Sequence, residues 1–226
     1  MSAADLESLD AVEFGARLLA RTPTHEGREH ALLRRWAAAA TEFGESLGEV
    51  PCRARVVESD GGLPLGLLAR YTSRPRPTVE LFTDTLARAE ALIDANGWRD
   101  WFPQGSVRAA ALAHEAVHEQ LHHGPGRAGL RRALHHVVLR VGRRRLYGHV
   151  AGAEEIAAHA YARKVCGLGR SPLLLTEALA EVSLVPAAAS PAVAKASPTL
   201  AAAAPSPAAP AATSPALAAA SPGREN

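Results

Sequence analysis

Apolar residues recur at helical spacing through the first part of the chain. Residues 6–19 carry them every three or four positions and end near Thr22-Pro23, and a second such segment runs from about residue 26 to 43. The second segment has its apolar positions on one face: Leu32, Leu33, Trp36 and Phe43. Both segments also carry scattered acidic residues, which favours two packed helices over a DNA-binding helix-turn-helix. The pattern predicts an N-terminal helical layer over residues 1–48.

The period then changes from helical to alternating. Short runs with β-branched and aromatic residues at 54–57, 66–71 and 78–82 are separated by glycine and proline. They predict three strands in a small antiparallel sheet. A helical pattern returns from Asp84 to Ala95 and ends at an Asn-Gly pair.

Further helical patterns continue to about residue 184. They predict helices over residues 109–123, 128–146, 153–166 and from Ser171-Pro172 to Leu184. Three aromatic residues just before the first of these are expected in the core: Trp98, Trp101 and Phe102. Residues 49–184 are therefore predicted to form a mainly helical α+β domain with a small sheet.

The end of the chain has a different composition. Beyond Val185 the sequence consists almost entirely of alanine, proline and serine, with no aromatic residue. Prolines every few residues prevent a continuous helix, and nothing there can build a core. We predict that residues 185–226 form a disordered tail.

Targeting signals and cysteine usage bear on the compartment. The N-terminus is acidic and amphipathic, without the basic and then apolar order of a signal peptide, and no uninterrupted apolar run reaches about 18 residues. Cys52 and Cys166 lie far apart and outside any metal-binding spacing, as expected for reduced, buried thiols. We expect a cytoplasmic protein that does not enter a membrane.

The formal net charge is only +2, but its distribution is uneven. No acidic residue lies between Glu119 and Glu154, whereas seven arginines do: Arg127, Arg131, Arg132, Arg140, Arg143, Arg144 and Arg145. This basic segment could contact an acidic protein or a nucleic-acid backbone. Arginines on the outer face of a helix are commonly just solvated, so a nucleic-acid partner is not favoured and stays open.

The predicted helix at 109–123 contains the motif His114-Glu115-Ala116-Val117-His118, an HExxH sequence. Residues four apart share one face of a helix, so both imidazoles can reach one zinc ion at about 2.0–2.1 Å. Glu115 directly follows His114 and is turned away from the face that the two histidines share. From there it can accept a proton from a metal-bound water. The alternative is a solvated helix rich in histidine, since this chain also carries His122, His123, His135 and His136.

A hydrolytic zinc needs a third protein ligand and an open position for water. The best candidates are the glutamates of the helix predicted at 153–166. That helix and the HExxH motif together resemble the ImmA/IrrE family of metallopeptidases, in which HExxH is followed by a helix reading roughly E-x-x-A-N/D-x-F-A. Glu155, Ala158, His159, Tyr161 and Ala162 stand at those spacings, and His159 departs from the family's Asn or Asp.

The resemblance covers about residues 66–166 and implies a zincin-like fold. It assigns Glu155, and not Glu154, as the third zinc ligand beside His114 and His118, with Glu115 as the catalytic base. The small residues Ala158 and Ala162 lie on the same face of the predicted helix 153–166 as Glu155. They would allow this helix to approach the HExxH helix closely. The role of His159 stays open between a hydrogen bond to a ligand, competition for the metal, and another orientation.

The implied activity is zinc-dependent hydrolysis of a peptide bond in a protein or peptide that adds to an edge strand. Members of the family cleave transcriptional repressors, so a regulator is one possible substrate. One alternative is a zinc-binding regulator without peptidase activity. Another is a ferritin-like di-iron protein, which would need a second ExxH motif and two more helical glutamates. The oligomeric state, the trigger and the substrate stay open.

Overall fold

We describe the chain from a computed structural model that covers residues 3–122 and 125–183. The chain divides into two units, Met1–Ala188 and Ala189–Asn226, and the described residues all belong to the first. The tail predicted at 185–226 lies outside them.

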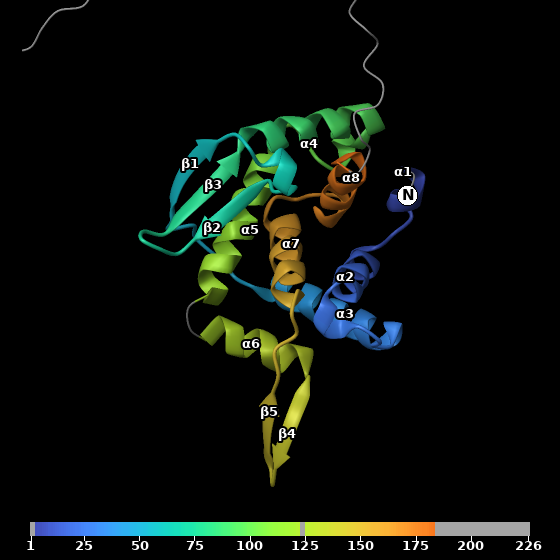
Figure 1. The fold of residues 1–226 in the computed structure, drawn as a ribbon, viewed down its shortest axis with the longest axis vertical. Coiled ribbons are helices and arrows are strands. Elements are labelled where there is room, and N and C mark those ends of the chain that lie inside the picture. The colour runs from blue at the N-terminus through green and yellow to red at the C-terminus, as the bar shows by residue number, and fades with distance from the viewer. Residues whose placement is uncertain (1–2, 123–124, 184–226) are drawn as a thin grey trace, which may run out of the picture. The chain divides into compact units, whose positions relative to one another are not determined.

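The described part is an α+β structure in which helices predominate (Figure 1). Its helices are α1 (Ala3–Glu7), α2 (Ala11–Ala20), α3 (His30–Ser46), α4 (Thr83–Asn96), α5 (Ser106–His122), α6 (Pro125–Leu134), α7 (Ala153–Val165) and α8 (Leu173–Ser183). Its strands are β1 (Arg55–Ser59), β2 (Ala69–Thr72), β3 (Thr78–Phe82), β4 (Val137–Val141) and β5 (Arg144–Tyr147). Short 3₁₀ turns occur at Pro23–His25, Leu63–Leu65 and Trp98–Asp100. Among the described residues, no helix has the length and apolar character needed to cross a membrane.

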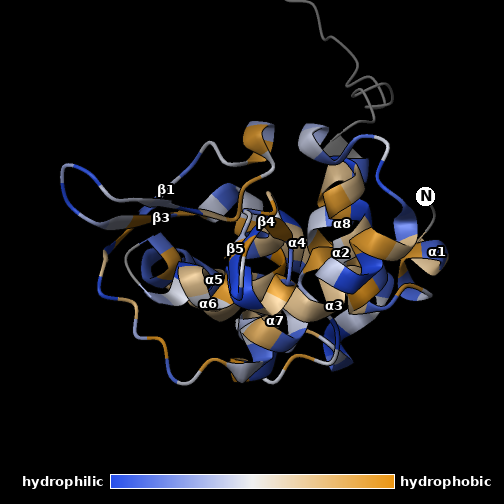
Figure 2. Cartoon of the chain, turned by 90° about the horizontal axis from the view of Figure 1, so that it is seen from below, coloured by the Kyte–Doolittle hydropathy of each residue, from blue (hydrophilic) through white to orange (hydrophobic). Residues whose placement is uncertain are grey.

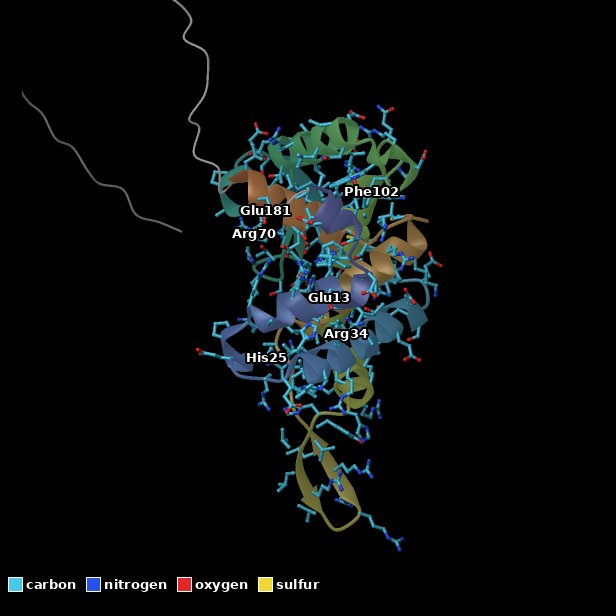
Figure 3. The ribbon with its side chains drawn as sticks, turned by 90° about the vertical axis from the view of Figure 1, so that its right-hand side faces the viewer. Glu13, His25, Arg34, Arg70, Phe102 and Glu181 are labelled. Carbon is cyan, nitrogen blue, oxygen red and sulfur yellow. The ribbon has the colours of Figure 1, made fainter. Side chains whose placement is uncertain are left out.

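The prediction of a single helix over residues 6–19 is wrong. Residues 6–19 divide into α1 and α2 because Asp10 adopts an extended conformation and its carboxylate accepts a hydrogen bond of 2.7 Å from the Glu13 backbone N–H. This is an N-terminal cap, so a new helix begins after Asp10. Glu13 also forms an ion pair of 2.6 Å with Arg34, which joins α2 to α3 (Figure 3).

The sheet is mixed, and the prediction of an antiparallel sheet is wrong for one of its two pairings. The strand order is β1-β3-β2, with β3 parallel to β1 and antiparallel to β2. The connection after β1 folds back because the Asp84 carboxylate accepts hydrogen bonds from the backbone N–H groups of Gly61, Gly62 and Leu63. Strand β3, which follows β2 in the chain, lies between β1 and β2, so β2 is at an edge of the sheet.

The prediction of one arginine-rich helix over residues 128–146 is also wrong. Helix α6 ends at Leu134, and His135 follows with a positive φ of 52° that breaks the helical path. Residues beyond it form the antiparallel hairpin β4–β5, closed by a turn in which Gly142 has a φ of 58°. Leu130 and Leu134 of α6 are buried, whereas Val138 and Val141 of the hairpin are exposed.

The core is organised around α7, which packs against α3 on one side and α5 on the other. Most of α7 is buried, including its alanines, so it behaves as a central helix even though its termini are polar. Buried residues of α2, α3 and α7 belong to one hydrophobic cluster, and the colouring by hydropathy shows hydrophobic and hydrophilic residues in each of these helices (Figure 2). The N-terminal layer and the later helices thus share one hydrophobic cluster.

The three aromatic residues predicted for the core pack there. Trp98 and Phe102 are buried, and Trp101 is partly buried against the same cluster.

The prediction of two buried thiols is wrong, although both cysteines are free. Cys52 is exposed, because it lies in the irregular segment before β1, and Cys166 is partly buried.

Candidate metal centre

Helix α5 places the two histidines of the HExxH motif side by side. One face of the helix is anchored in the core by Val117 and Leu121, which leaves His114 and His118 on a neighbouring face. Their Nε2 atoms lie 3.0 Å apart. Both side chains are mostly buried, with 13% and 19% of their surface exposed. Ser106 is the first residue of this helix, and its hydroxyl has no hydrogen-bond partner among the described residues.

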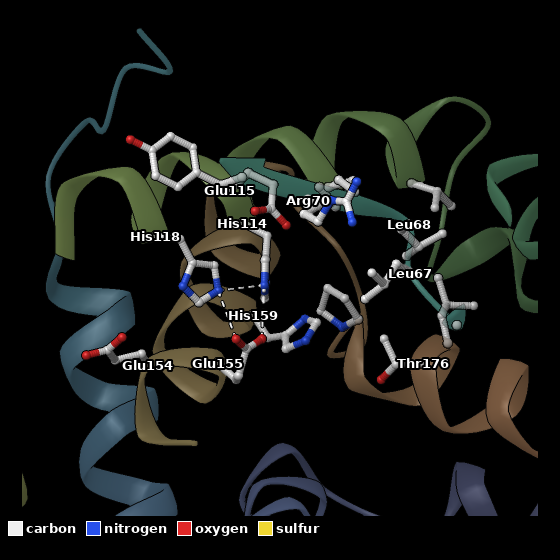
Figure 4. A pocket seen from close by; sticks show the side chains of 18 of the residues that line it. Leu67, Leu68, Arg70, His114, Glu115, His118, Glu154, Glu155, His159 and Thr176 are labelled. Carbon is white, nitrogen blue, oxygen red and sulfur yellow. Dashed lines mark hydrogen bonds and ion pairs between the residues drawn. The ribbon is translucent and has the colours of Figure 1, made fainter. Parts of the chain in front are cut away.

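Helix α7 brings Glu155 to the same place. Its two carboxylate oxygens lie 3.2 Å from the Nε2 atoms of His114 and His118, one oxygen to each ring (Figure 4). Ala158 and Ala162 are fully buried, so α7 can pack closely enough against α5 for Glu155 to contact both histidines. Glu154 points elsewhere and forms an ion pair of 3.4 Å with Arg127 of α6. The structure thus brings Glu155, and not Glu154, to the two histidines.

These spacings fit a small metal ion. Donor atoms that share a tetrahedral zinc at about 2.0–2.1 Å lie roughly 3.3 Å from one another. The observed separations of 3.0, 3.2 and 3.2 Å between the donors of His114, His118 and Glu155 are close to that value. Two imidazoles and one carboxylate are also a donor set that zinc commonly takes in hydrolytic sites. The three side chains are therefore close enough to share one metal ion, with either oxygen of Glu155 facing one of the two rings.

Electrostatics at the site couple these groups. Burial alone would raise the pKa of the Glu155 carboxyl, but the hydrogen bonds and charges of His114 and His118 outweigh it and lower that pKa. Burial alone would lower the pKa of His118, but its hydrogen bond with Glu155 and the nearby carboxylate charges together outweigh burial and raise that pKa. The carboxylate is therefore ionised at neutral pH, as a metal ligand must be.

Glu115 is next to the first histidine and is itself buried, with 7% of its surface exposed. Its side chain lines the same cavity as the three candidate ligands, and its carboxylate lies near His114 (Figure 4). The Nε2 atoms of both histidines pair with Glu155, which leaves the Glu115 carboxylate outside the ligand group. A carboxylate in this position is suited to accept a proton beside the metal.

The cavity has a volume of about 400 Å³ and opens on the candidate ligands. One wall is formed by Gly66–Tyr71, which leads into and includes most of edge strand β2. Another wall is apolar and combines residues at and just before the start of α5 with the region of α8: Phe102, Val107, Leu168, Pro172 and Leu175. Sequence reasoning did not predict that the α8 region would line the site, because nothing local distinguishes its leucines from ordinary core residues.

His159 also lies at the centre. It is buried, and its ring centroid is 4.3 Å from that of His114. His114, Glu155 and His159 each offer a donor atom, and these atoms all lie within 4.8 Å of one another. Burial, and then the neighbouring His114, lower the pKa of His159 well below its ordinary value. The structure therefore orients His159 toward the ligand group, where the sequence left several orientations open.

Comparisons with protein-family models, with curated proteins and with solved structures found no match. The function is therefore argued from the geometry of the centre and its cavity.

Proposed function

We propose that the chain is a zinc-dependent metallopeptidase that hydrolyses a peptide bond in a protein substrate. The observation that carries this proposal is the convergence of the His114, His118 and Glu155 donor atoms within 3.0–3.2 Å. The proposal includes a zincin-like fold, and the resemblance of the two motifs to ImmA/IrrE metallopeptidases supports it. A cytoplasmic location belongs to the same proposal.

Each residue has a distinct role in this proposal. His114, His118 and Glu155 hold the metal, with the Glu155 charge offsetting part of the metal's own. Zinc at such a centre polarises a carbonyl and lowers the pKa of a bound water to about 7. Glu115 accepts the proton of the attacking water and delivers it to the leaving amine.

The cavity indicates how a peptide would bind. Strand β2 pairs with β3 on one side only, so its other side is available to an extended peptide through main-chain hydrogen bonds. Because β2 lines the cavity, such a peptide would pass the candidate metal centre. The apolar wall formed by Phe102, Val107 and Leu175 then favours a substrate with an apolar side chain close to the scissile bond.

A second candidate is a zinc-binding interaction protein without peptidase activity. The β4–β5 hairpin favours it, because four of its apolar side chains are 52–65% exposed: Val138, Leu139, Val141 and Leu146. Exposed apolar side chains gathered on one element are typical of contact surfaces. This candidate keeps the metal but assigns Glu115 no chemical task.

A substitution at Glu115 separates the two candidates. Glu115→Gln keeps the size of the side chain but cannot accept a proton, so turnover should fall ~10²-fold or more while zinc stays bound. The proteomes of cells producing wild type, Glu115→Gln or the control Glu42→Gln, an exposed position on α3, are compared for new N-termini. Peptidase action predicts new N-termini with wild type and Glu42→Gln alone. The same phenotype with all three proteins, and no cleavage products, would replace the peptidase by the interaction protein.

A further inference from the structure

Helix α7 presents two candidate donors to the centre, as α5 does. Glu155 and His159 are four residues apart, one helical turn, just as His114 and His118 are on α5. His114 and Glu155 form a shared pair, with His118 to one side of it and His159 to the other (Figure 4). The centre therefore contains a donor that a three-ligand site leaves without a role.

The environment of His159 is not that of a histidine with a purely structural role. Its Nδ1 is buried and has no hydrogen-bond partner among the described residues, so the ring is not a satisfied core residue. It does not support His114 from behind either, because the Nδ1 of His114 is likewise buried and without a partner there. A histidine that supports a ligand normally does so through a hydrogen bond of that kind. A buried, unpaired imidazole costs free energy unless a further partner is bound.

We propose that His159 is a fourth protein ligand of this metal centre, which closes the centre at rest and must withdraw before a substrate carbonyl can enter. This inference rests on the proposed metal centre. Four protein donors are typical of closed zinc sites, whereas hydrolytic sites keep one position open. His159 lines the cavity, so the ring has space on its substrate side into which it can move. The chain is thus a latent metallopeptidase whose cavity occupant competes with His159.

His159 is close enough to take part in the centre. Its donor atom lies within 4.8 Å of those of His114 and Glu155, and donors that share one tetrahedral zinc lie roughly 3.3 Å apart. A rotation of the ring within the cavity can bring its donor onto the metal or take it away without movement of α7.

The direct test counts imidazoles on the metal. X-ray absorption spectra of the full chain with one equivalent of zinc distinguish three imidazoles from two. We expect three in the wild type, two in His159→Asn, and three in the control His149→Asn, which removes an exposed histidine before α7. Two imidazoles in the wild type would overturn the inference and leave the three-ligand centre intact. Failure of the wild type to bind zinc would overturn the proposed function as well.

A second readout addresses the closure itself. Acetohydroxamate, a small chelating probe, is titrated into the cobalt-substituted proteins and followed by visible absorption. It should bind His159→Asn at least ~10-fold more tightly than wild type, because no protein ligand has to leave. Equal affinity in the two proteins would contradict closure by His159. The wild-type imidazole count decides the ligand assignment even if His159→Asn folds poorly.

Discussion

The α5–α7 helix pair and the β4–β5 hairpin differ sharply in burial, although the hairpin lies between those helices in the sequence. Ala158 and Ala162 of α7 are fully buried, and Glu155 of α7 contacts both histidines of α5. In the hairpin, by contrast, Val138, Leu139 and Val141 are more than half exposed. The hairpin projects away from the helices, as Figure 1 shows.

This difference indicates which part of the chain determines the site. The separation between Glu155 and the histidines depends on how closely two helices approach, and this in turn depends on small residues in the core. The exposed hairpin side chains bury little surface, so they contribute little to stability. Changes in the helix pair should therefore alter both the fold and the metal, whereas changes in the hairpin should alter neither strongly.

The largest effect is expected at Glu155. Glu155→Ala should weaken zinc binding by more than the ~10–100-fold typical of losing a residue that supports a ligand, because a ligand itself is removed. Glu154→Ala is the matched control, since Glu154 contacts Arg127 and not the histidines. Competition titrations with a zinc chelator measure both. A larger loss with Glu154→Ala would show that the register of α7 at the centre is wrong.

The next effect concerns the approach of the helices. Ala158→Leu inserts a bulky side chain at a fully buried position, so the free energy of unfolding should fall by about 1–3 kcal/mol in the metal-free protein. Urea unfolding in the presence of a chelator measures it. Ala95→Leu makes the same change at an exposed position of α4 and should stay within about 0.5 kcal/mol. Equal stability of the two variants would mean that α7 is not tightly packed there.

A smaller effect is expected from pH. In the metal-free protein the pKa of His118 is raised, since Glu155 outweighs the opposing effect of burial. Zinc must displace that proton, so affinity should fall as pH decreases through the raised pKa, by up to about tenfold per pH unit for one proton. Calorimetric titrations in buffers of different ionisation enthalpy measure the proton release. Glu155→Gln should release fewer protons, and an unchanged number would contradict the coupling.

The smallest effect is expected in the hairpin. Arg140 lies directly opposite Arg145 in the strand register, and like charges in that position are unfavourable. Arg140→Glu should therefore raise the free energy of unfolding by about 0.2–1 kcal/mol. The control Arg143→Glu, in the turn, lacks a cross-strand partner in that register and should give no such gain. Thermal unfolding at low salt compares them, and an equal gain in both would indicate a general charge effect.

The sequence predicted best those helices whose boundaries carry local signals. The region of α7 lies between Gly152 and Gly167, both with positive φ, and the structure places the helix from Ala153 to Val165. Helix α4 likewise ends before Gly97, whose φ is 69°. In such cases the conformational freedom of glycine marks the boundary regardless of the tertiary contacts.

The hairpin shows why the same reasoning failed elsewhere. The run Val137–Val141 contains apolar residues at spacings compatible with both a helix and a strand, and the preceding residues do form a helix. The β-branched residues and Gly142 were the local signals that favour a hairpin. Its bounds also depend on His135, whose positive φ no local pattern indicates.

The centre itself was predictable only in part. The spacing of His114 and His118 follows from helix geometry, and the family resemblance pointed to Glu155. The orientation of His159 and the apolar cavity wall depend on contacts among helices far apart in the sequence. No local pattern contains that information.

The central claim, a single zinc held by α5 and α7, is tested most directly by the metal content of the purified full chain. Elemental analysis should find one zinc per chain in the wild type, and much less in His118→Asn, which removes one of the two adjacent imidazoles. No bound metal after purification from zinc-supplemented cells would contradict the claim. Two irons per chain would contradict it as well, and would favour the di-iron alternative.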